Sequence, residues 1–508
     1  MKAIWTSCLA LLLTTLILTT MVACGGNGGS SSPSPAPPTP NPVGYSTANL
    51  NGNYVFSLSG VGLYYGEPFA VVGVFTADGN GNITSGQQDV NDPVYGLQQQ
   101  AAISSGTYSV GTDGRGQATL NFASGSSATF SFVLVSASKA RIIEMSNVEL
   151  SSGLFELQST APVSAPNGPY VLRMDGSSSS GASSGAPISR VGLLTATGTG
   201  GSAVLDENYR GTFTPTIAVP SIAFSNFSGT SGRGVLQFDT SQGGATSTGT
   251  TIDLVFYVVS PTRIEFLSVN ASEQLSGYAD AQSGTFTTAS VSSPYVYSIS
   301  GYSATGFITE TGSFALNSSG AVSNGLEDFV DTGNYSASVP FSGTYAFDST
   351  NNGHFTGAFT ASNRTVNFAL WFSSSSPQNA VLMAYNSTSS LIESGLVAVQ
   401  PAVPTTSTVS GNYALHLGGS TNSGGPTVLK GQLSADGVST LTGLEDLNQA
   451  GNVIIGASAG GSYSVASGRG TGTIGGIPVV LYPASSSTTY VMSTDGTRML
   501  AGSLEAQH

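Results

Sequence analysis

The sequence 51-NGNYVFSLSG-60 begins a unit that occurs four times along the 508-residue chain. Its tyrosine, Tyr54, recurs as Tyr170, Tyr295 and Tyr413, at spacings of 116, 125 and 118 residues. These periods are longer than the 20 to 50 residues typical of solenoid repeats, so each copy is expected to be a domain with its own core. The predicted domains span residues 49–161, 166–289, 291–403 and 408–508.

Period-2 alternation within the first unit predicts strands. Tyr54, Phe56 and Leu58 share one face, with Val or Ser between them. Runs between turn signals predict eight strands, near residues 53–60, 68–77, 82–91, 98–110, 116–123, 128–136, 140–147 and 153–160. Short hairpin turns such as Asp78-Gly79 favour an antiparallel meander, and eight strands can close into an up-and-down barrel without free edges. The predicted class is therefore all-β, with an immunoglobulin-like sandwich as the alternative.

Three further landmarks keep the same order in every unit. The residues concerned are the acidic strand positions Asp89, Asp206, Glu327-Asp328 and Glu445-Asp446, the turn positions Arg115, Arg233, His354 and Arg469, and the closing glutamines Gln158, Gln282, Gln400 and Gln507. Adjacent strand residues point to opposite faces, so neither Glu-Asp pair can flank one glycosidic bond, and both pairs are predicted to be solvated. His354 stands where other units have Arg and is interpreted as a turn residue.

Composition narrows the class of function. Only 13 Lys+Arg and 27 Asp+Glu give a net charge of −14, and charged residues make up 8% of the chain where about 25% is usual. A chain so poor in cations is not expected to bind nucleic acid, which requires Lys and Arg on phosphates. Long amphipathic helices are disfavoured as well, because the apolar residues stand among Ser, Thr and Gly.

The N-terminus predicts export and a lipid anchor. Lys2 precedes an apolar run from Ala3 to Val22 that ends at Cys24, which predicts a signal peptide at 1–23. A single membrane-spanning helix is the alternative. Residues 24–48 are rich in Gly, Ser and Pro and are expected to form a disordered tether. Cys8 lies inside the signal, so the mature chain offers no disulfide.

The segment Met21-Val22-Ala23-Cys24, followed by tandem β-units, resembles the pattern of bacterial repeat-containing surface lipoproteins. In such proteins the cysteine after the cleavage site carries acyl chains. The resemblance implies lipidation of Cys24 and, because Gly25 replaces Asp, sorting to the outer membrane. It implies no catalytic residue. Two or more acyl chains would make the anchor durable.

Few residues carry candidate chemistry. Asp78, Asn80, Asn82 and Asp89 match positions 1, 3, 5 and 12 of a calcium loop, but Ile83 replaces the required Gly, so the residues form only a weak calcium candidate beside a plain hairpin turn. Trp371 lies opposite the face of Phe368, Leu370 and Phe372, where it would contact a surface ligand, pack on a neighbouring domain or be buried. The G-x-S-x-G matches at 181–185 and 456–460 lack a following helix pattern, so no catalytic residue and no cofactor is predicted.

These observations predict a non-catalytic binding or adhesion array, anchored to the outer membrane and either surface-exposed or periplasmic. Its expected partners are the membrane, through Cys24, and a glycan or a surface protein. Four weak sites on one tether would gain affinity through effective concentration. The alternatives are a structural spacer without a ligand, a carrier of a small ligand inside a barrel, and, least favoured, a hydrolase.

Overall fold

The computed structural model describes residues 44–178, 185–238, 252–361, 364–375, 378–386 and 390–508, which belong to one compact unit, Pro38–His508. The predicted signal peptide, Cys24 and most of the predicted tether lie outside the described residues. Two 3-10 helices, η1 (Thr47–Asn49) and η3 (Thr406–Thr408), precede the first and last units. Within the described residues, no helix combines the length and the apolar character needed to cross a membrane.

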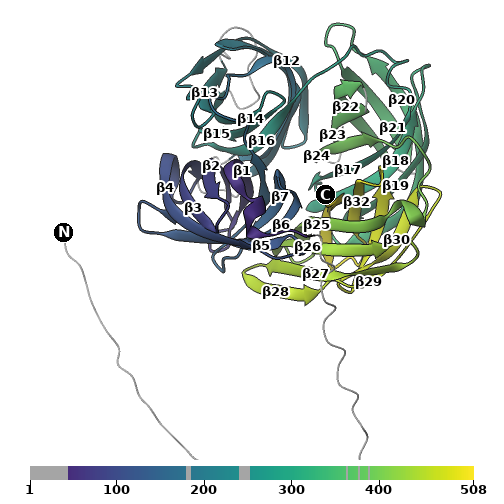
Figure 1. The fold of residues 1–508 in the computed structure, drawn as a ribbon. Coiled ribbons are helices and arrows are strands. Elements are labelled where there is room, and N and C mark those ends of the chain that lie inside the picture. The colour runs from purple at the N-terminus through teal and green to yellow at the C-terminus, as the bar shows by residue number, and fades with distance from the viewer. Residues whose placement is uncertain (1–43, 179–184, 239–251, 362–363, 376–377, 387–389) are drawn as a thin grey trace, which may run out of the picture. The chain divides into compact units, whose positions relative to one another are not determined.

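The first unit is a closed barrel in which each strand pairs antiparallel with the next and β1 pairs with β8 (Figure 1). Its strands are β1 (Asn51–Gly62), β2 (Pro68–Asp78), β3 (Asn82–Asp92), β4 (Gly96–Val110), β5 (Arg115–Phe122), β6 (Ser127–Ser136), β7 (Lys139–Glu144) and β8 (Glu149–Leu157). The predicted up-and-down barrel is confirmed, and the sandwich alternative is wrong.

Barrels 2 and 3 repeat this topology. Barrel 2 consists of β9 (Asn167–Ser178), β10 (Ala186–Thr197), β11 (Gly200–Tyr209), β12 (Thr212–Ser225), β13 (Arg233–Phe238), β14 (Ile252–Ser260), β15 (Arg263–Ser268) and β16 (Glu273–Ala281). Barrel 3 consists of β17 (Pro294–Tyr302), β18 (Phe307–Leu316), β19 (Ala321–Asp331), β20 (Asn334–Phe347), β21 (His354–Ala361), β22 (Arg364–Ser375), β23 (Gln378–Asn386) and β24 (Leu391–Val399).

Barrel 4 has nine strands because its fourth strand is broken at Ala459-Gly460. The strands are β25 (Ser410–Thr421), β26 (Pro426–Asp436), β27 (Thr440–Gln449), β28 (Asn452–Ser458), β29 (Gly461–Ala466), β30 (Arg469–Ile474), β31 (Ile477–Pro483), β32 (Thr488–Ser493) and β33 (Arg498–Ala506). Both β28 and β29 pair with β27, and the β26–β27 pairing closes this sheet too.

Several strands are buried on both faces, which the alternation pattern alone did not indicate. In β1, Tyr54 and Phe56 face the interior of barrel 1, while Val55, between them, is fully buried against barrel 2. Val55 belongs there to an apolar cluster that includes Val72 and Tyr257. Strands covered on both sides become nearly continuous apolar runs. The barrels are therefore packed against one another.

Each barrel contacts its neighbours in chain order, and barrel 4 also contacts barrel 1. Apolar clusters join barrel 1 to barrel 2, barrel 2 to barrel 3 and barrel 3 to barrel 4. Two smaller clusters join barrel 4 to barrel 1, one around Ala414 and one around Val428. The contacts therefore form a closed cycle of four barrels.

A buried aspartate marks every one of these four interfaces. Asp89, Asp206, Asp328 and Asp446, on the third strand of each barrel, are at most 1% exposed. Asp89 pairs with Arg233 of barrel 2 at 2.7 Å, and Asp328 pairs with Arg469 of barrel 4 at 2.7 Å. His354 lies 3.1 Å from Asp206. The last pair returns to the first barrel, since Arg115 binds Asp446.

The closing glutamines follow the same cycle. Gln158 donates to the carbonyl of Val258 at 2.8 Å, Gln282 to that of Phe372 at 2.8 Å, and Gln400 to that of Pro483 at 2.7 Å, each in the next barrel. Gln507 instead donates to the carbonyl of Leu134 in barrel 1, at 2.8 Å. The repeated landmarks of the sequence are thus interface residues.

The prediction that the two Glu-Asp pairs are solvated is wrong. Asp328 and Asp446 are buried between barrels, while their neighbours point to the opposite face and are buried as well: Glu327 is 0% and Glu445 6% exposed. Burial raises the pKa of Glu327 to about 9 and that of Glu445 to about 7.

His354 does follow a turn, as predicted. It is also buried and contacts the carboxylate of Asp206, which the turn interpretation did not include.

Candidate functional site

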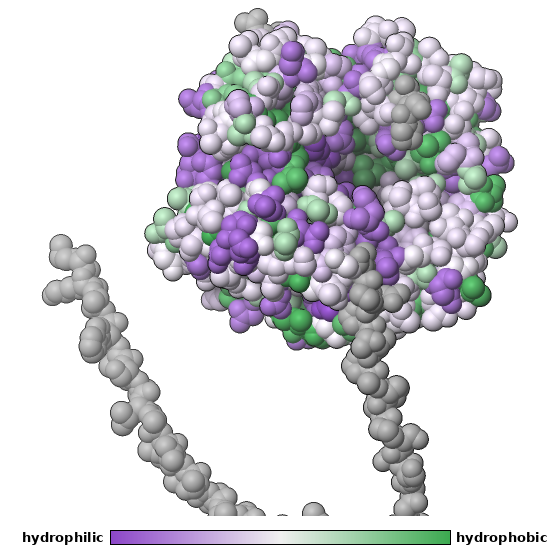
Figure 2. All heavy atoms as spheres, in the orientation of Figure 1, coloured by the Kyte–Doolittle hydropathy of each residue, from purple (hydrophilic) through white to green (hydrophobic). Residues whose placement is uncertain are grey.

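A large hollow with polar walls lies where the barrels meet. It has a volume of about 600 Å³ and is lined mainly by the outward faces of the first, seventh and eighth strands of barrels 1 and 2. Barrel 3 contributes residues such as Asn379 and Leu396, and barrel 4 contributes Tyr490. Figure 2 shows hydrophilic side chains gathered around this hollow.

Cations of the chain are concentrated here. Lys139 and Arg141 come from β7, Arg173 from β9 and Arg263 from β15, and all four line the cavity. They are four of the 13 Lys+Arg in the whole sequence. Alternation along a strand puts Lys139 and Arg141 on the same face of β7, turned away from the core of their own barrel. A protein with few charges has thus placed a large share of them in one cavity.

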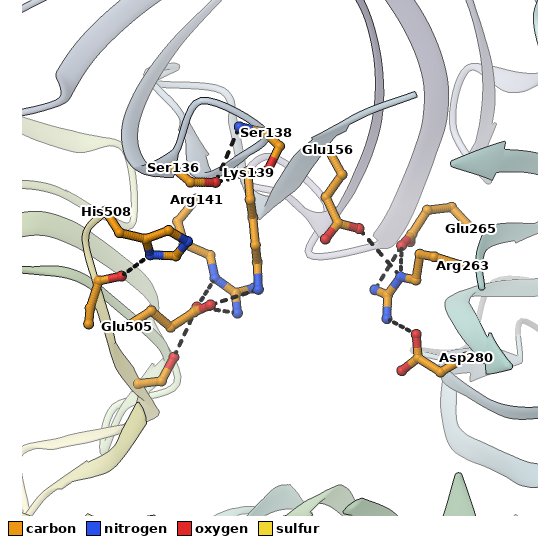
Figure 3. A network of polar contacts seen from close by, with 12 residues as sticks. Ser136, Ser138, Lys139, Arg141, Glu156, Arg263, Glu265, Asp280, Glu505 and His508 are labelled. Atoms are coloured by element: carbon orange, nitrogen blue, oxygen red, sulfur yellow. Dashed lines mark hydrogen bonds and ion pairs between the residues drawn. The ribbon is translucent and has the colours of Figure 1, made fainter. Parts of the chain in front are cut away.

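One side of the site is organised around Glu505 of barrel 4 (Figure 3). The ammonium group of Lys139 lies 2.7 Å from one oxygen of Glu505, and Nε of Arg141 donates to the other oxygen at 2.5 Å. Burial would raise the pKa of Glu505, but Arg141 and Lys139 outweigh it and lower the pKa to about 2. A second hollow of about 540 Å³, also lined by Lys139 and Arg263, adjoins this side.

The other side is organised around Arg263 (Figure 3). Its guanidinium lies 2.8 Å from Glu265, 3.0 Å from Asp280 and 3.4 Å from Glu156, which belongs to barrel 1. It also stacks on the ring of Tyr278, 3.8 Å from the ring centroid. Burial raises the pKa of Glu265 to about 7 despite this cation.

The four cations are balanced by carboxylates. Arg173, the last of them, pairs with Asp175 at 2.7 Å and donates to Ser394 of barrel 3. The ion pairs are only partly buried, with side-chain exposures such as 30% for Lys139 and 43% for Asp280. Such walls offer many fixed hydrogen-bond donors and acceptors without a strong net charge. The arrangement suits a polar ligand better than a bare anion.

The predicted calcium residues do not form one site. Asp78, Asn80 and Asn82 are together in the β2–β3 turn, where Asp78 accepts from the backbone N–H groups of both asparagines at 2.7 and 3.0 Å. Asp89 is buried at the interface with barrel 2 and is bound to Arg233. The hairpin turn is the correct interpretation. Among the described residues, no group of three or more His, Cys, Asp or Glu has an arrangement suited to a metal ion.

Trp371 is not available to a surface ligand. Its side chain is 0% exposed and points out of barrel 3, as the alternation predicted, but it packs on Val171 and Val191 of barrel 2. Its Nε1 donates to Asp206 at 2.7 Å. Of the alternatives left open by the sequence, packing on a neighbouring domain is the one observed, and the surface-contact interpretation is wrong. Cys24, the predicted lipidation site, lies outside the described residues.

Sequence reasoning did not identify the shared cavity. The sequence feature that could have indicated it is a basic residue at the beginning of the seventh strand in two units, in a chain with few cations. The two segments are Lys139-Ala-Arg141 and Arg263-Ile-Glu265. That signal shows which residues share a face but not that the faces of different barrels converge. Convergence depends on the packing of the barrels.

Comparison with known proteins gives little further information. No protein-family model and no curated protein matches the chain. Among solved structures, it is weakly similar to isotype 1 transferrin binding protein B from serogroup B Neisseria meningitidis, at 8% identity over 70% of this chain and 79% of that chain, with a TM-score of 0.18. Kievitone hydratase from Nectria haematococca gives 7% identity, 71% and 95% coverage and a TM-score of 0.16. These scores carry no argument about function.

Proposed function

We propose that this protein is a non-catalytic binding protein of the cell envelope and that its ligand enters the cavity shared by the barrels. The supporting observation is the concentration of Lys139, Arg141, Arg173 and Arg263 in one hollow of about 600 Å³. Charged side chains that served only to keep the protein in solution would not need to be gathered in one cavity. The sequence suggested four equal sites, one on each barrel. The outer faces of the barrels are instead packed against one another, so we propose one site lined by residues of all four barrels.

The proposed ligand is a glycan or a similar hydroxyl-rich molecule. Paired charges present oriented donors and acceptors, and hydroxyl groups can bind to both. Tyr278 and Tyr490 add aromatic surface to the walls. A volume of about 600 Å³ is within the range typical of small-molecule sites.

The binding test compares the purified protein with cavity variants on a glycan array, followed by calorimetry on any hit. Tyr278→Ala and Arg173→Ala are expected to weaken binding at least tenfold. The matched control is Tyr302→Ala, which removes a tyrosine that is 48% exposed and does not line the cavity. Binding that is unchanged in both cavity variants, or no binding to any glycan, would overturn the proposed ligand site.

The envelope location rests on the N-terminal sequence and is tested separately. We propose that Cys24 carries the lipid anchor and holds the barrels at the outer membrane. Cys24→Ser is expected to move the protein from the membrane fraction to the soluble fraction, because the acyl chains are lost. Continued membrane retention of this variant would contradict the anchor.

A further inference from the structure

One end of barrel 1 is open. The turns that follow β1, β3, β5 and β7 lie at this end, and a cavity of about 340 Å³ extends from it into the barrel. Its floor is apolar, with Leu58, Val71 and Phe130. By contrast, the void in the core of barrel 3 measures about 10 Å³. The volume in barrel 1 is at the lower end of the range typical of small-molecule sites.

Three carboxyl groups line this cavity without a cation. They are Asp92, Glu144 and Glu149, and the lining contains no Lys, Arg or His. Glu144 is only 7% exposed; it accepts a hydrogen bond from the hydroxyl of Ser151 at 2.8 Å and shares a hydrogen bond with the carboxyl group of Glu149. Asp92 accepts from the backbone N–H groups of Val94 and Tyr95. Ionised carboxylates are costly here without a positive partner, so the pair of Glu144 and Glu149 either retains a proton or binds a cation.

Barrel 2 shows what occupies the same place when the barrel is filled. Arg190 there binds Glu273 through two nitrogens, each at 2.9 Å, and Glu207 at 2.8 Å. Met174, which is four residues after Tyr170, lies between two partners: Arg190 on β10 and Gly277 on β16. Glu273 is four residues before Gly277 on the same strand. This register decides the equivalent positions in barrel 1.

In barrel 1 the same register leads to Val71 and Glu149. Leu58, which is four residues after Tyr54, lies between Val71 on β2 and Gly153 on β8. Glu149 is four residues before Gly153 on the same strand. The carboxylate of Glu273 therefore has a counterpart in Glu149, whereas the arginine is replaced by Val71. Both residues line the cavity. The hollow in barrel 1 occupies the region that the Arg190 side chain fills in barrel 2.

The rim adds a second, independent feature. Tyr64 and Tyr65, in the β1–β2 turn, are 83% and 63% exposed, and Tyr95, in the β3–β4 turn, is 71% exposed. Tyr95 also lines the cavity. Exposed aromatic residues beside the mouth of a cavity are typical of binding sites, and aromatic faces attract organic cations.

We propose that the open end of barrel 1 binds a small organic cation, whose guanidinium or ammonium group takes the place that Arg190 has in barrel 2. The head group binds Glu149 and Glu144, and a short apolar body lies between the floor and the tyrosines. This site is separate from the shared cavity, so neither proposal depends on the other.

The titration of the site is consistent with this occupant. Burial, and then the nearby charge of Glu149, raises the pKa of Glu144 to about 7. Burial and the charge of Asp92 also raise the pKa of Glu149. A bound cation favours the ionised carboxylates, so affinity is expected to fall as the pH drops below 7.

The test is calorimetric titration of the purified protein with agmatine, which carries a guanidinium and an ammonium group. The uncharged probe butylurea serves as the ligand control. Glu149→Gln, which keeps the shape of the side chain, is expected to weaken agmatine binding at least tenfold. Val71→Arg, which gives barrel 1 the arginine of barrel 2, is expected to abolish it. Asp78→Asn, at the opposite end of the barrel, is the control variant.

Agmatine binding that Glu149→Gln weakens and Asp78→Asn leaves unchanged would support the site. If Val71→Arg does not fold, Glu149→Gln alone decides the outcome. The proposal is overturned if agmatine does not bind at millimolar concentration, if butylurea binds equally well, or if Glu149→Gln binds agmatine like the unmodified protein.

Discussion

The interfaces that join consecutive barrels differ from the one that closes the cycle. At the consecutive interfaces, the buried aspartate accepts a hydrogen bond from a large aromatic donor on the sixth strand of the next barrel: Tyr257 at 2.6 Å, Trp371 at 2.7 Å and Tyr482 at 2.5 Å. At the closing interface, the corresponding donor to Asp446 is Ser131, at 2.6 Å. The missing volume is supplied from the other side by Lys430, whose ammonium group lies 2.7 Å from Asp446.

The position of Lys430 explains this exchange. By strand register it corresponds to Val72 in barrel 1, Val191 in barrel 2 and Thr311 in barrel 3, all of them small. At the three consecutive interfaces the aspartate has a large aromatic donor and a small residue at the Lys430 position. At the closing interface it has a small donor, Ser131, and the long side chain of Lys430. The same space is filled in both cases, but only the closing interface places a fully buried lysine on the carboxylate.

The closing interface differs from the others in its charges and in the division of its apolar contact. Its two apolar clusters contain three buried residues each, whereas single clusters of eight, five and eight buried residues join barrels 1 and 2, barrels 2 and 3, and barrels 3 and 4. It also lacks a covalent link between the two barrels. Two cations, Arg115 and Lys430, share one carboxylate at this interface.

The largest effect is expected from breaking a consecutive interface. Asp89→Ala leaves Arg233, only 4% exposed, and the Tyr257 hydroxyl without their partner. Removing one member of a buried ion pair costs about 3–5 kcal/mol, because arginine cannot lose its charge. Urea unfolding followed by Trp371 fluorescence would measure this loss. A cost below about 1 kcal/mol would contradict the structural role assigned to Asp89.

The closing interface is expected to show a pH dependence of its own. Burial lowers the pKa of Lys430 from 10.5 to about 8. Between these values the unfolded chain binds more protons than the folded chain, so this group makes stability rise with pH. Relative to Lys430→Met, the free energy of unfolding should increase by about 3 kcal/mol between pH 8 and pH 10.5. A constant difference between the two proteins over this range would show that Lys430 does not titrate as described.

Converting the closing interface to the consecutive type tests the exchange of volumes. Ser131→Tyr alone is expected to collide with Lys430, and Lys430→Val alone leaves a hollow beside Asp446. The double variant should be more stable than the sum of the single changes indicates, with a coupling of about 1–2 kcal/mol in a double-mutant cycle. Additive effects would mean that Ser131 and Lys430 do not share this space.

The smallest expected difference concerns the closing glutamines. Gln158→Ala leaves the carbonyls of Ser231 and Val258 without their donor at a buried position, and should cost about 1–3 kcal/mol. Gln507→Ala removes the equivalent bonds at the less buried chain end and should cost about 1 kcal/mol. Comparison of the two thermal unfolding midpoints checks this order. A larger loss for Gln507→Ala would show that the chain end is a main support of the closure.

Much of the fold follows from local pattern. The alternation of Tyr54, Phe56 and Leu58 and the turn at Asp78-Gly79 predicted the strands of barrel 1 to within a few residues. The same residues could not reveal what the other face of β1 contacts, since Val55 would fit an exposed or a buried position. The candidate cavity was missed for the same reason, because Lys139, Arg173 and Arg263 are far apart in sequence.

The sequence by itself determined the four-fold repeat and the all-β class and favoured up-and-down barrels over a sandwich, because the side-chain period of a strand and the chemistry of tight turns are local properties. Only the tertiary structure decided that the repeated Asp, Arg and Gln landmarks join one barrel to the next. It also decided that Trp371 is buried and that one barrel interior has room for a ligand. Those facts depend on which surfaces meet and how completely side chains fill a core, and both are set by packing over long distances along the chain.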